Sequence, residues 1–322
     1  YRAQGFSREV SQVLTQSRSD TTYKQYQVYF QKWNQFCDQR TINPKSPNLN
    51  DCLQFLVEMK NTVGYSAIST AKAALNSFIK IEDKYLGRHE TTTRFMAGIA
   101  KQMPRTPKYE EIWDPEKVVT FLKSWSPARK LNLLQISAKT AALILLVSGQ
   151  RPQILHHLTL DNMQLKSTSV SFTISKNLKH SRGNAPATQI AVKSYPDKRV
   201  CVVTYIKAYL NRVEKIRNDR QFFVTTTKPH QGATQATLSR WVKLILQKSG
   251  INIHKFGPGS TRSAAANAAY RSGVPLQTIM TKAAWQVKST FNTWYKKPLQ
   301  KKDHYQSAIL GKSKFDHRKS HK

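Results

Sequence analysis

The apolar residues of this chain recur at two different spacings, and this change of spacing constrains the fold more than any other feature. Over most of the sequence they recur every three or four residues, which is the period of an amphipathic helix. Only 170–174 and 188–192 alternate apolar with polar residues, as half-buried strands do. Between them, 176–186 is rich in turn-forming residues. We therefore expect a mainly α-helical protein with a small antiparallel β-sheet built on one hairpin.

The first hundred residues carry helical signals throughout. One stripe of apolar residues at helical spacing is formed by Tyr23, Tyr26, Phe30, Trp33 and Cys37. Such a stripe most simply faces the core of a bundle and is not a platform for stacking bases. Asn50 and Ser66 each precede a further apolar pattern and are expected to cap two more helices. The pattern predicts an all-helical bundle in this part of the chain.

Proline residues mark the boundary between two expected domains. The stretch QMPRTPKY, residues 102–109, is polar and interrupted by prolines, as linkers are. Asp114 and Pro115 then form a helix start, with Asp as the cap and Pro in the first turn. We expect a helical domain, a linker, a second domain and a basic tail at residues 1–105, 106–113, 114–300 and 301–322.

Basic residues strongly outnumber acidic ones, above all in the second domain. Lys and Arg total 52 against 18 Asp and Glu, a formal charge of +34. Between Met163 and Lys302 the acidic residues are Asp197, Glu214 and Asp219. An ordinary surface mixes both signs, so this region is expected to lie on phosphates. With 39% hydrophobic residues the chain is too apolar for a disordered basic tail, and the sequence predicts a folded protein that binds a polyanion.

Several classes of protein are excluded by what the sequence lacks. It has no run of 18 apolar residues that would span a membrane. Cys37, Cys52 and Cys201 lack metal-binding spacing and are expected to be reduced, buried thiols of an intracellular protein. The sequence has no cluster of Asp and Glu for magnesium and no phosphate-binding loop. We expect no metal and no cofactor.

Five motifs in the second half occur in the order and at the spacing found in one enzyme family. They are SGQRPQILHHLTL, SKNLKHSRGNAP, TLSRWVKLILQKSGI, FGPGSTRSAA and AAWQVKSTFNTWY. With these motifs the chain resembles the tyrosine recombinases, a phage-integrase-like family, and most of all their eukaryotic transposon branch, the DIRS- and Ngaro-type retrotransposons and the Cryptons. The N-terminal bundle is more weakly similar to the family's core-binding domain. The resemblance implies a two-domain clamp around duplex DNA, with a helical core-binding domain and an α/β catalytic domain.

The resemblance assigns roles to five residues. Arg151 and Arg262 match the two catalytic arginines, whose guanidinium groups can fork onto a phosphate. Tyr295 matches the nucleophile, which holds the 3′ end of the cut strand covalently. Trp285 takes a position that is filled by His or Trp in the family. Lys179 matches the hairpin lysine that protonates the departing 5′ oxygen.

Other interpretations stay open for three of these positions. Lys176 lies three residues before Lys179, and the register of a hairpin cannot be read from one sequence. Tyr270 and Tyr305 are fallback nucleophiles. A buried tryptophan such as Trp285 belongs to a core far more often than to a catalytic site.

Two positions depart from the pattern of the family. The residue three before the second arginine is usually histidine, and here it is Gly259, which cannot exchange a proton with the nucleophile. The acidic residue that often follows the first arginine is replaced by Ile154. Three interpretations remain: catalysis proceeds without this histidine, another histidine such as His254 reaches the site, or the chain is a weakened relative that still binds DNA.

The function implied by the resemblance is site-specific recombination of DNA for a mobile element, through a covalent phosphotyrosine. The partners would be double-stranded DNA and further copies of the chain, assembled as a tetramer on two duplexes. Contacts with DNA are expected from Arg182, Lys228, Arg240 and Lys288. A nuclear location follows from this function alone. The alternatives are a DNA-binding protein derived from such an element and a topoisomerase-like enzyme that nicks and rejoins DNA as a monomer.

Overall fold

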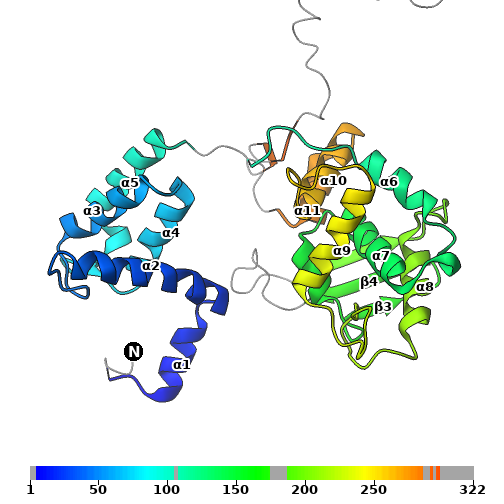
Figure 1. The fold of residues 1–322 in the computed structure, drawn as a ribbon, viewed down its shortest axis with the longest axis horizontal. Helices are drawn as coiled ribbons and strands as arrows, with labels where there is room; N and C mark the ends of the chain where they lie inside the picture. Colours follow the sequence, from blue (N-terminus) through cyan, green and yellow to red (C-terminus); the bar gives the residue numbers. More distant parts are fainter. Residues whose placement is uncertain (1–4, 105–107, 175–186, 286–290, 293–294, 298–322) are drawn as a thin grey trace, which may run out of the picture. The chain divides into compact units, whose positions relative to one another are not determined.

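The computed structural model describes residues 5–104, 108–174, 187–285, 291–292 and 295–297. The chain divides into two compact units, Tyr1–Thr106 and Pro107–Lys322 (Figure 1). Each unit has a hydrophobic core of its own. Both are mostly helical and carry a small antiparallel sheet, so the predicted fold class is confirmed.

Helices form most of the first unit. They are α1 (Arg8–Gln16), α2 (Asp20–Asp38), α3 (Leu49–Lys60), α4 (Tyr65–Leu75) and α5 (Glu90–Gln102). The short strands β1 (Lys80–Ile81) and β2 (Lys84–Tyr85) and the 3-10 helix η2 (Leu86–Arg88) lie between α4 and α5.

Two of the predicted helix caps in this unit are wrong. The cap of α3 is Asn48, two residues before Asn50, and its side chain forms a capping box with Asp51. The helix α4 begins directly after Gly64, which has no side chain to cap it, and Ser66 lies inside the first turn. Asn50 and Ser66 both have side chains that can cap a helix. Only the geometry of the turn shows that each helix begins at another residue nearby.

The prediction of an all-helical bundle is also wrong in one place. Strands β1 and β2 pair in antiparallel fashion, with Lys80 opposite Tyr85. Glu82 and Asp83 form the turn between them, with φ angles of 47° and 61°. Positive φ at both central residues is the signature of a type I′ turn, which glycine and asparagine favour. A turn made of two acidic residues gave no such signal.

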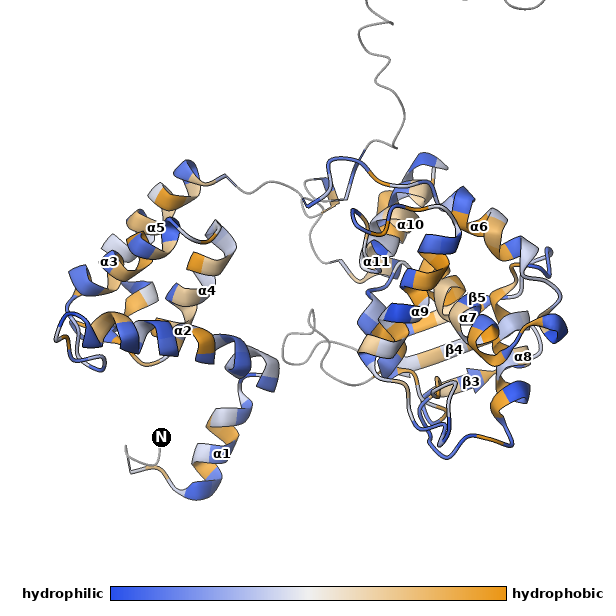
Figure 2. Cartoon of the chain, viewed as in Figure 1, coloured by the Kyte–Doolittle hydropathy of each residue, from blue (hydrophilic) through white to orange (hydrophobic). Residues whose placement is uncertain are grey.

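The predicted aromatic stripe of α2 faces the core of the first unit only at its C-terminal end, because Tyr23, Tyr26 and Phe30 are half-buried and lie outside that core. Trp33 and Cys37 are fully buried, and the Trp33 ring lies 5.6 Å from the ring of Phe36 and 5.3 Å from that of Phe55. Hydrophilic and hydrophobic residues alternate along α2 in Figure 2, as on any helix with one buried face. All three cysteines of the chain are free and buried.

The second unit surrounds one central helix. Its elements are α6 (Pro115–Ser124), η3 (Ala128–Lys130), α7 (Leu133–Ser148), η4 (Pro152–His157), β3 (Met163–Leu165), β4 (Ser169–Ile174), β5 (Thr188–Lys193), α8 (Val202–Val213), α9 (Gln235–Lys248), α10 (Ser260–Arg271) and α11 (Leu276–Ala283). The long apolar helix α7 packs against α8, α9, α10 and β5.

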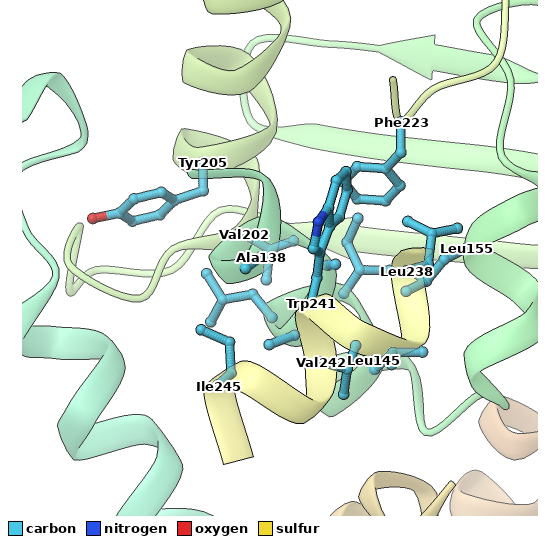
Figure 3. Packing of buried hydrophobic residues seen from close by; sticks show 14 of the residues in the cluster. Ala138, Leu145, Leu155, Val202, Tyr205, Phe223, Leu238, Trp241, Val242 and Ile245 are labelled. Atoms are coloured by element: carbon cyan, nitrogen blue, oxygen red, sulfur yellow. The ribbon is translucent and has the colours of Figure 1, made fainter. Parts of the chain in front are cut away.

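Side chains from several helices meet around α7. Figure 3 shows Trp241 of α9 beside Phe223, with Ala138 and Leu145 of α7 close by. The rings of Trp241 and Phe223 are 6.0 Å apart in an edge-to-face arrangement. Since α7 is apolar on nearly every face, its burial on all sides is what its sequence requires.

The sheet of the second unit has the order β3-β4-β5 and is antiparallel throughout. The two strands predicted from alternating residues pair as expected, with Phe172 opposite Ile190. On the other side, β3 pairs with β4 and places Met163 opposite Phe172. Strand β3 was not predicted, because three residues are too few to show an alternation. The basic hairpin tip, 176–186, lies outside the described residues.

The beginning of the second unit is part of its core. Asp114 caps α6 by accepting a hydrogen bond from the Glu116 amide, and Pro115 opens the helix, so this predicted start is confirmed. Just before it, at the end of the predicted linker 106–113, Ile112 and Trp113 are fully or almost fully buried.

One lysine lies in the middle of this apolar core. Lys139 on α7 is fully buried. Its ammonium group donates hydrogen bonds of 2.6, 2.6 and 2.7 Å to the carbonyl oxygens of Leu122, Trp125 and Arg199. It also lies 3.7 Å from the centre of the Tyr205 ring. Its three N–H groups match three acceptors, and the ring adds a cation–π contact.

Candidate active site

The start of α10 is held in a fixed geometry by short side chains. Ser260 Oγ donates to the Gly257 carbonyl oxygen at 2.7 Å, and Thr261 Oγ1 donates to that of Pro258 at 2.7 Å. The indole N–H of Trp113 donates to Ser260 Oγ at 2.8 Å. This first turn therefore fixes where the next residue of the helix, Arg262, enters the unit.

Arg262 is 1% exposed, which is rare for an arginine. Its Nη1 donates a weak hydrogen bond to the Gly149 carbonyl oxygen at 3.4 Å. Within the described part of the chain, its Nε and Nη2 form no hydrogen bond of ordinary geometry. Burial and the nearby charge of Arg151 lower the pKa of the Arg262 guanidinium, while Tyr295 opposes this shift. The group remains a cation at neutral pH.

Arg151 lies beside Arg262 because of how α7 ends. Gly149 ends α7 in the left-handed conformation, with φ of 62°. The chain therefore changes direction just before Arg151. The Gly149 carbonyl oxygen is the one that accepts from Arg262. Gln150, 2% exposed, donates from Nε2 to the carbonyl oxygen of Lys282 near the end of α11 at 2.6 Å. One short loop thus joins the first arginine to α10 and to α11.

Trp285 follows α11 and completes the wall of the site. Its backbone N–H donates to the Met280 carbonyl oxygen, after Ala284 has ended the helix with φ of 51°. The indole is 8% exposed, and its ring lies 4.7 Å from the Arg262 guanidinium. Its Nε1 also has no partner among the described residues, and neither does Ser263 Oγ.

Tyr295 lies against both of these groups. Its ring centre is 4.4 Å from that of Trp285, and the Arg262 guanidinium is 5.8 Å from the Tyr295 ring. The residue is half-buried, and its backbone N–H donates to the Phe291 carbonyl oxygen. Arg151, Arg262, Trp285 and Tyr295, predicted from three separate motifs, therefore lie close together at one site.

The other predicted site residues fall in two groups. Lys176, Lys179, Arg182 and Lys288 lie outside the described residues, as does the fallback nucleophile Tyr305. Lys228 and Arg240 are both exposed, the first before α9 and the second on it. Arg240 donates to Thr237 Oγ1 at 3.1 Å. The roles of all these residues in DNA binding or catalysis stay predictions.

The two departures from the family's pattern have different surroundings. Gly259 precedes α10 with an ordinary φ of −63°, and a Cβ atom built on it would meet nothing within 4 Å. His254 lies in the exposed turn after α9. Ile154 is buried in the core, 2% exposed, so a packed apolar side chain stands where an acidic one is usual.

Tyr270, the other fallback nucleophile, lies on the outer part of α10. Its ring packs 5.3 Å from that of Phe291, and the Lys296 ammonium group is 5.5 Å from its centre. It is 38% exposed. The described residues include no group of three or more His, Cys, Asp or Glu that would hold a metal ion. They also contain no helix long and apolar enough to cross a membrane.

Comparison with known proteins identifies the family. Residues 114–302, more than half of the chain, match the family described as the phage integrase family. A solved structure of XerH site-specific recombinase bound to difH substrate is similar over 76% of this chain and 66% of that one, with a TM-score of 0.51 and 13% identity. The chain thus spans about two thirds of that protein.

Two further structures are similar in the same way. A lambda integrase dimer bound to a COC' core site matches over 90% of this chain and 75% of that one, with a TM-score of 0.53 and 12% identity. The Tn1549 transposon integrase in complex with transposon right end DNA matches over 77% and 80%, with a TM-score of 0.51 and 15% identity. No curated protein sequence matches this one. The fold is shared with these recombinases, and the chain belongs to the phage integrase family of tyrosine recombinases.

Proposed function

We propose that this chain is a site-specific recombinase that cuts and rejoins DNA through a covalent bond between Tyr295 and a 3′ phosphate. Neither a metal nor a nucleotide takes part in this chemistry. The observation that carries the proposal is a set of buried donors without partners beside the Tyr295 ring: Arg262 Nε, Arg262 Nη2 and Trp285 Nε1. A buried donor that lacks an acceptor costs about 1–3 kcal/mol.

A phosphodiester satisfies these donors and offsets the charge of the arginines. Its two non-bridging oxygens accept hydrogen bonds and share a negative charge, which suits the two positive charges of Arg151 and Arg262. The Arg262 guanidinium lies 4.7 Å from the Trp285 ring and 5.8 Å from the Tyr295 ring, so aromatic surface adjoins these donors. Fixed donors in such a site stabilise the extra negative charge that develops on the phosphate in the transition state.

The proposed reaction forms one P–O bond for each one that it breaks. Tyr295 Oη attacks the phosphorus and gives its proton to a water molecule, and the 5′ oxygen of the cut strand leaves and gains a second proton. By the family resemblance Lys179 supplies that second proton. A 5′ hydroxyl from another DNA then attacks the phosphotyrosine, and the reverse step joins the new strands. Because the energy of the bond is kept in the phosphotyrosine, no nucleotide is consumed.

The partners of this reaction are proposed from charge and from the similar proteins. The three similar structures are complexes with DNA, and the net charge of +34 suits the same partner. Arg182, Lys228, Arg240 and Lys288 are proposed to contact its backbone. Strand exchange needs two duplexes, and we propose a tetramer on them. The proposal also includes a mobile element of the eukaryotic transposon branch as the source, and the nucleus as the location.

Gly259 favours a second candidate function. Without a side chain that exchanges protons at this position, the chain would bind DNA and fail to cut it. A protein of this kind keeps the basic surface and the fold and lacks the chemistry. The two functions differ in one product, the covalent adduct.

Covalent capture tests the proposal. The protein is incubated with a library of randomised duplexes that carry a nick near each candidate site, so that the short leaving strand diffuses away and religation fails. A denaturing gel is expected to show a DNA-shifted protein band, and sequencing of the trapped DNA gives the site. Tight binding on a native gel without any adduct would favour the second candidate.

Restoring the missing histidine is expected to raise the rate of capture. In Gly259→His the imidazole joins a helix start that has open space around the new Cβ and an ordinary φ, so the fold is retained. Proton transfer by a positioned side chain contributes about 10²–10⁴-fold in enzymes generally, and we expect at least about a tenfold gain in the single-turnover rate.

Gly259→Ala is the matched control, because it adds the Cβ without the imidazole. Its capture rate is expected to equal that of the wild type. A gain in both variants would assign the effect to the stiffened backbone at the start of α10 and not to proton transfer. If the capture rate fell in Gly259→His and not in Gly259→Ala, the expectation that a histidine at this position exchanges a proton with Tyr295 would be wrong.

A further inference from the structure

The segment that carries Tyr295 is held against α10 by one buried side chain. Asn267, 2% exposed, lies on α10 five residues after Arg262. Its Nδ2 donates to the carbonyl oxygen of Tyr295. Its Oδ1 accepts a hydrogen bond of 3.0 Å from the backbone N–H of Lys297. The same side chain therefore binds the backbone at Tyr295 and again two residues later.

A third hydrogen bond fixes the orientation of the Asn267 side-chain amide. Nδ2 also donates to the Ser263 carbonyl oxygen in the preceding turn of α10, at 3.0 Å. A side-chain amide has two N–H groups and one carbonyl oxygen, so both donors and the acceptor are used. With all of them used, the asparagine cannot turn away without leaving a buried polar group unpaired. Asn267 is thus a rigid link between the arginine helix and the Tyr295 backbone.

Two other contacts support the same segment farther from the nucleophile. Arg271 Nη2 donates to the Lys297 carbonyl oxygen at 2.8 Å, and Lys297 Nζ donates to the Tyr109 carbonyl oxygen. Both act on Lys297. The bond from Asn267 acts on the peptide group of Tyr295 itself, so Asn267 has the more direct effect on where the phenol points.

We propose that Asn267 is a positioning residue for nucleophilic attack by Tyr295. This inference rests on the proposed function. Arg262 and Asn267 belong to one helix, and one of them lies at the site of the phosphate while the other holds the nucleophile. The distance between the attacking oxygen and the phosphorus is then set by the rigid geometry of α10. A misplacement of about 1 Å in such an arrangement costs about a hundredfold in rate.

An asparagine elsewhere in the same unit provides a matched control. Asn162 is half-buried before β3, and its side chain also binds two backbone groups, both of which precede it in the chain. Its Nδ2 donates to the His157 carbonyl oxygen at 2.8 Å, and its Oδ1 accepts from the Thr159 N–H at 3.0 Å. Asn162→Ala thus removes a comparable set of bonds away from Tyr295.

The first measurement separates binding from chemistry. In Asn267→Ala we expect the single-turnover rate of covalent capture to fall at least tenfold, while the Kd for the same duplex stays within twofold of the wild type. In Asn162→Ala we expect both values to stay within twofold. An asparagine that only supports the fold would give the same result at both positions, and that outcome would overturn the proposal.

The second measurement observes the nucleophile without DNA. 3-Fluorotyrosine is placed at position 295, and its ¹⁹F resonance is recorded. In the wild type the Trp285 ring, with its centre 4.4 Å from the Tyr295 ring, is expected to shift this resonance away from that of the unfolded protein. The shift is expected to shrink in Asn267→Ala and to stay unchanged in Asn162→Ala. An unchanged shift in Asn267→Ala would overturn the proposal.

The two measurements also separate this proposal from the proposed function. If the wild type forms no adduct while the ¹⁹F shift depends on Asn267, the proposed function fails and the link between α10 and Tyr295 stands. If the wild type forms the adduct and Asn267→Ala forms it at the same rate, the positioning role alone fails.

Discussion

Tyr295→Phe is expected to abolish covalent capture of DNA completely. The change removes the one oxygen that would bond to phosphorus, so no slower route to the adduct remains at this residue. The ring contacts with Trp285 and Arg262 need no hydroxyl, so the fold of the site is retained. Affinity for duplex DNA, which depends mainly on cations at the backbone, is expected to stay within about twofold of the wild type. Denaturing and native gels of the same samples measure the two effects.

Tyr270→Phe is the control for this experiment. Tyr270 lies on α10, and it is partly exposed with its ring against Phe291. It is expected to form the adduct at the wild-type rate. If Tyr295→Phe still forms an adduct, Tyr295 is not the nucleophile, and the same change at Tyr270 and Tyr305 would then locate it.

Lys139→Met is expected to lower the stability of the second unit by at least about 3 kcal/mol, because each of three carbonyl oxygens loses its donor at a cost of about 1–3 kcal/mol. Methionine fills a similar volume but leaves the carbonyl oxygens of Leu122, Trp125 and Arg199 without their shared donor. The melting temperature of a unit of this size would fall by about 10 °C. Calorimetry or circular dichroism against temperature measures this change.

Lys207→Met separates the loss of a network from the loss of a charge. Lys207 on α8 is half-buried, and its ammonium group donates to one carbonyl oxygen, that of Ser167, at 2.8 Å. We expect this variant to lose less than about 1 kcal/mol, as substitutions near the surface generally do. Equal losses in the two variants would show that the three carbonyl oxygens find other donors.

Elements with strong local signals were predicted from the sequence. Helix α8, Val202–Val213, follows the three- and four-residue spacing that predicts helices over most of the chain, because its apolar period is regular along its whole length. The start of helix α6 at Asp114 was predicted because an acidic cap followed by proline is typical of the first turn of a helix. Strands β4 and β5 were predicted from their alternation, which needs one buried and one open face.

Features that depend on distant residues were not predicted. The turn at Glu82 and Asp83 has no glycine or asparagine, and only its setting in the folded unit holds it in positive φ. Lys139 interrupts an apolar helix, and no local pattern shows that three carbonyl oxygens from other elements surround it. Asn267 gave no signal for the same reason, since its partners lie about 30 residues later in the chain.

The candidate site lies between these two cases. Family resemblance predicted the site residues Arg151, Arg262, Trp285 and Tyr295 from their order in the chain. That order does not say how far apart the residues lie in the folded protein. The structure adds that these residues are neighbours and that the donors of Arg262 are buried without partners. It also shows open space at Gly259, which the sequence alone cannot give because an absent side chain leaves no pattern.

The contact between Lys297 and Tyr109 has a consequence for the order in which the enzyme matures. These residues are 188 positions apart, and Trp113 and Ser260, which also contact each other, are 147 apart. Contacts of such long sequence separation form late in folding, because the intervening chain must be ordered first. A nascent or truncated chain that lacks the last of these segments therefore has its arginines but no anchored tyrosine. By the proposed function, such a chain lacks its nucleophile and is expected to form no covalent adduct with DNA.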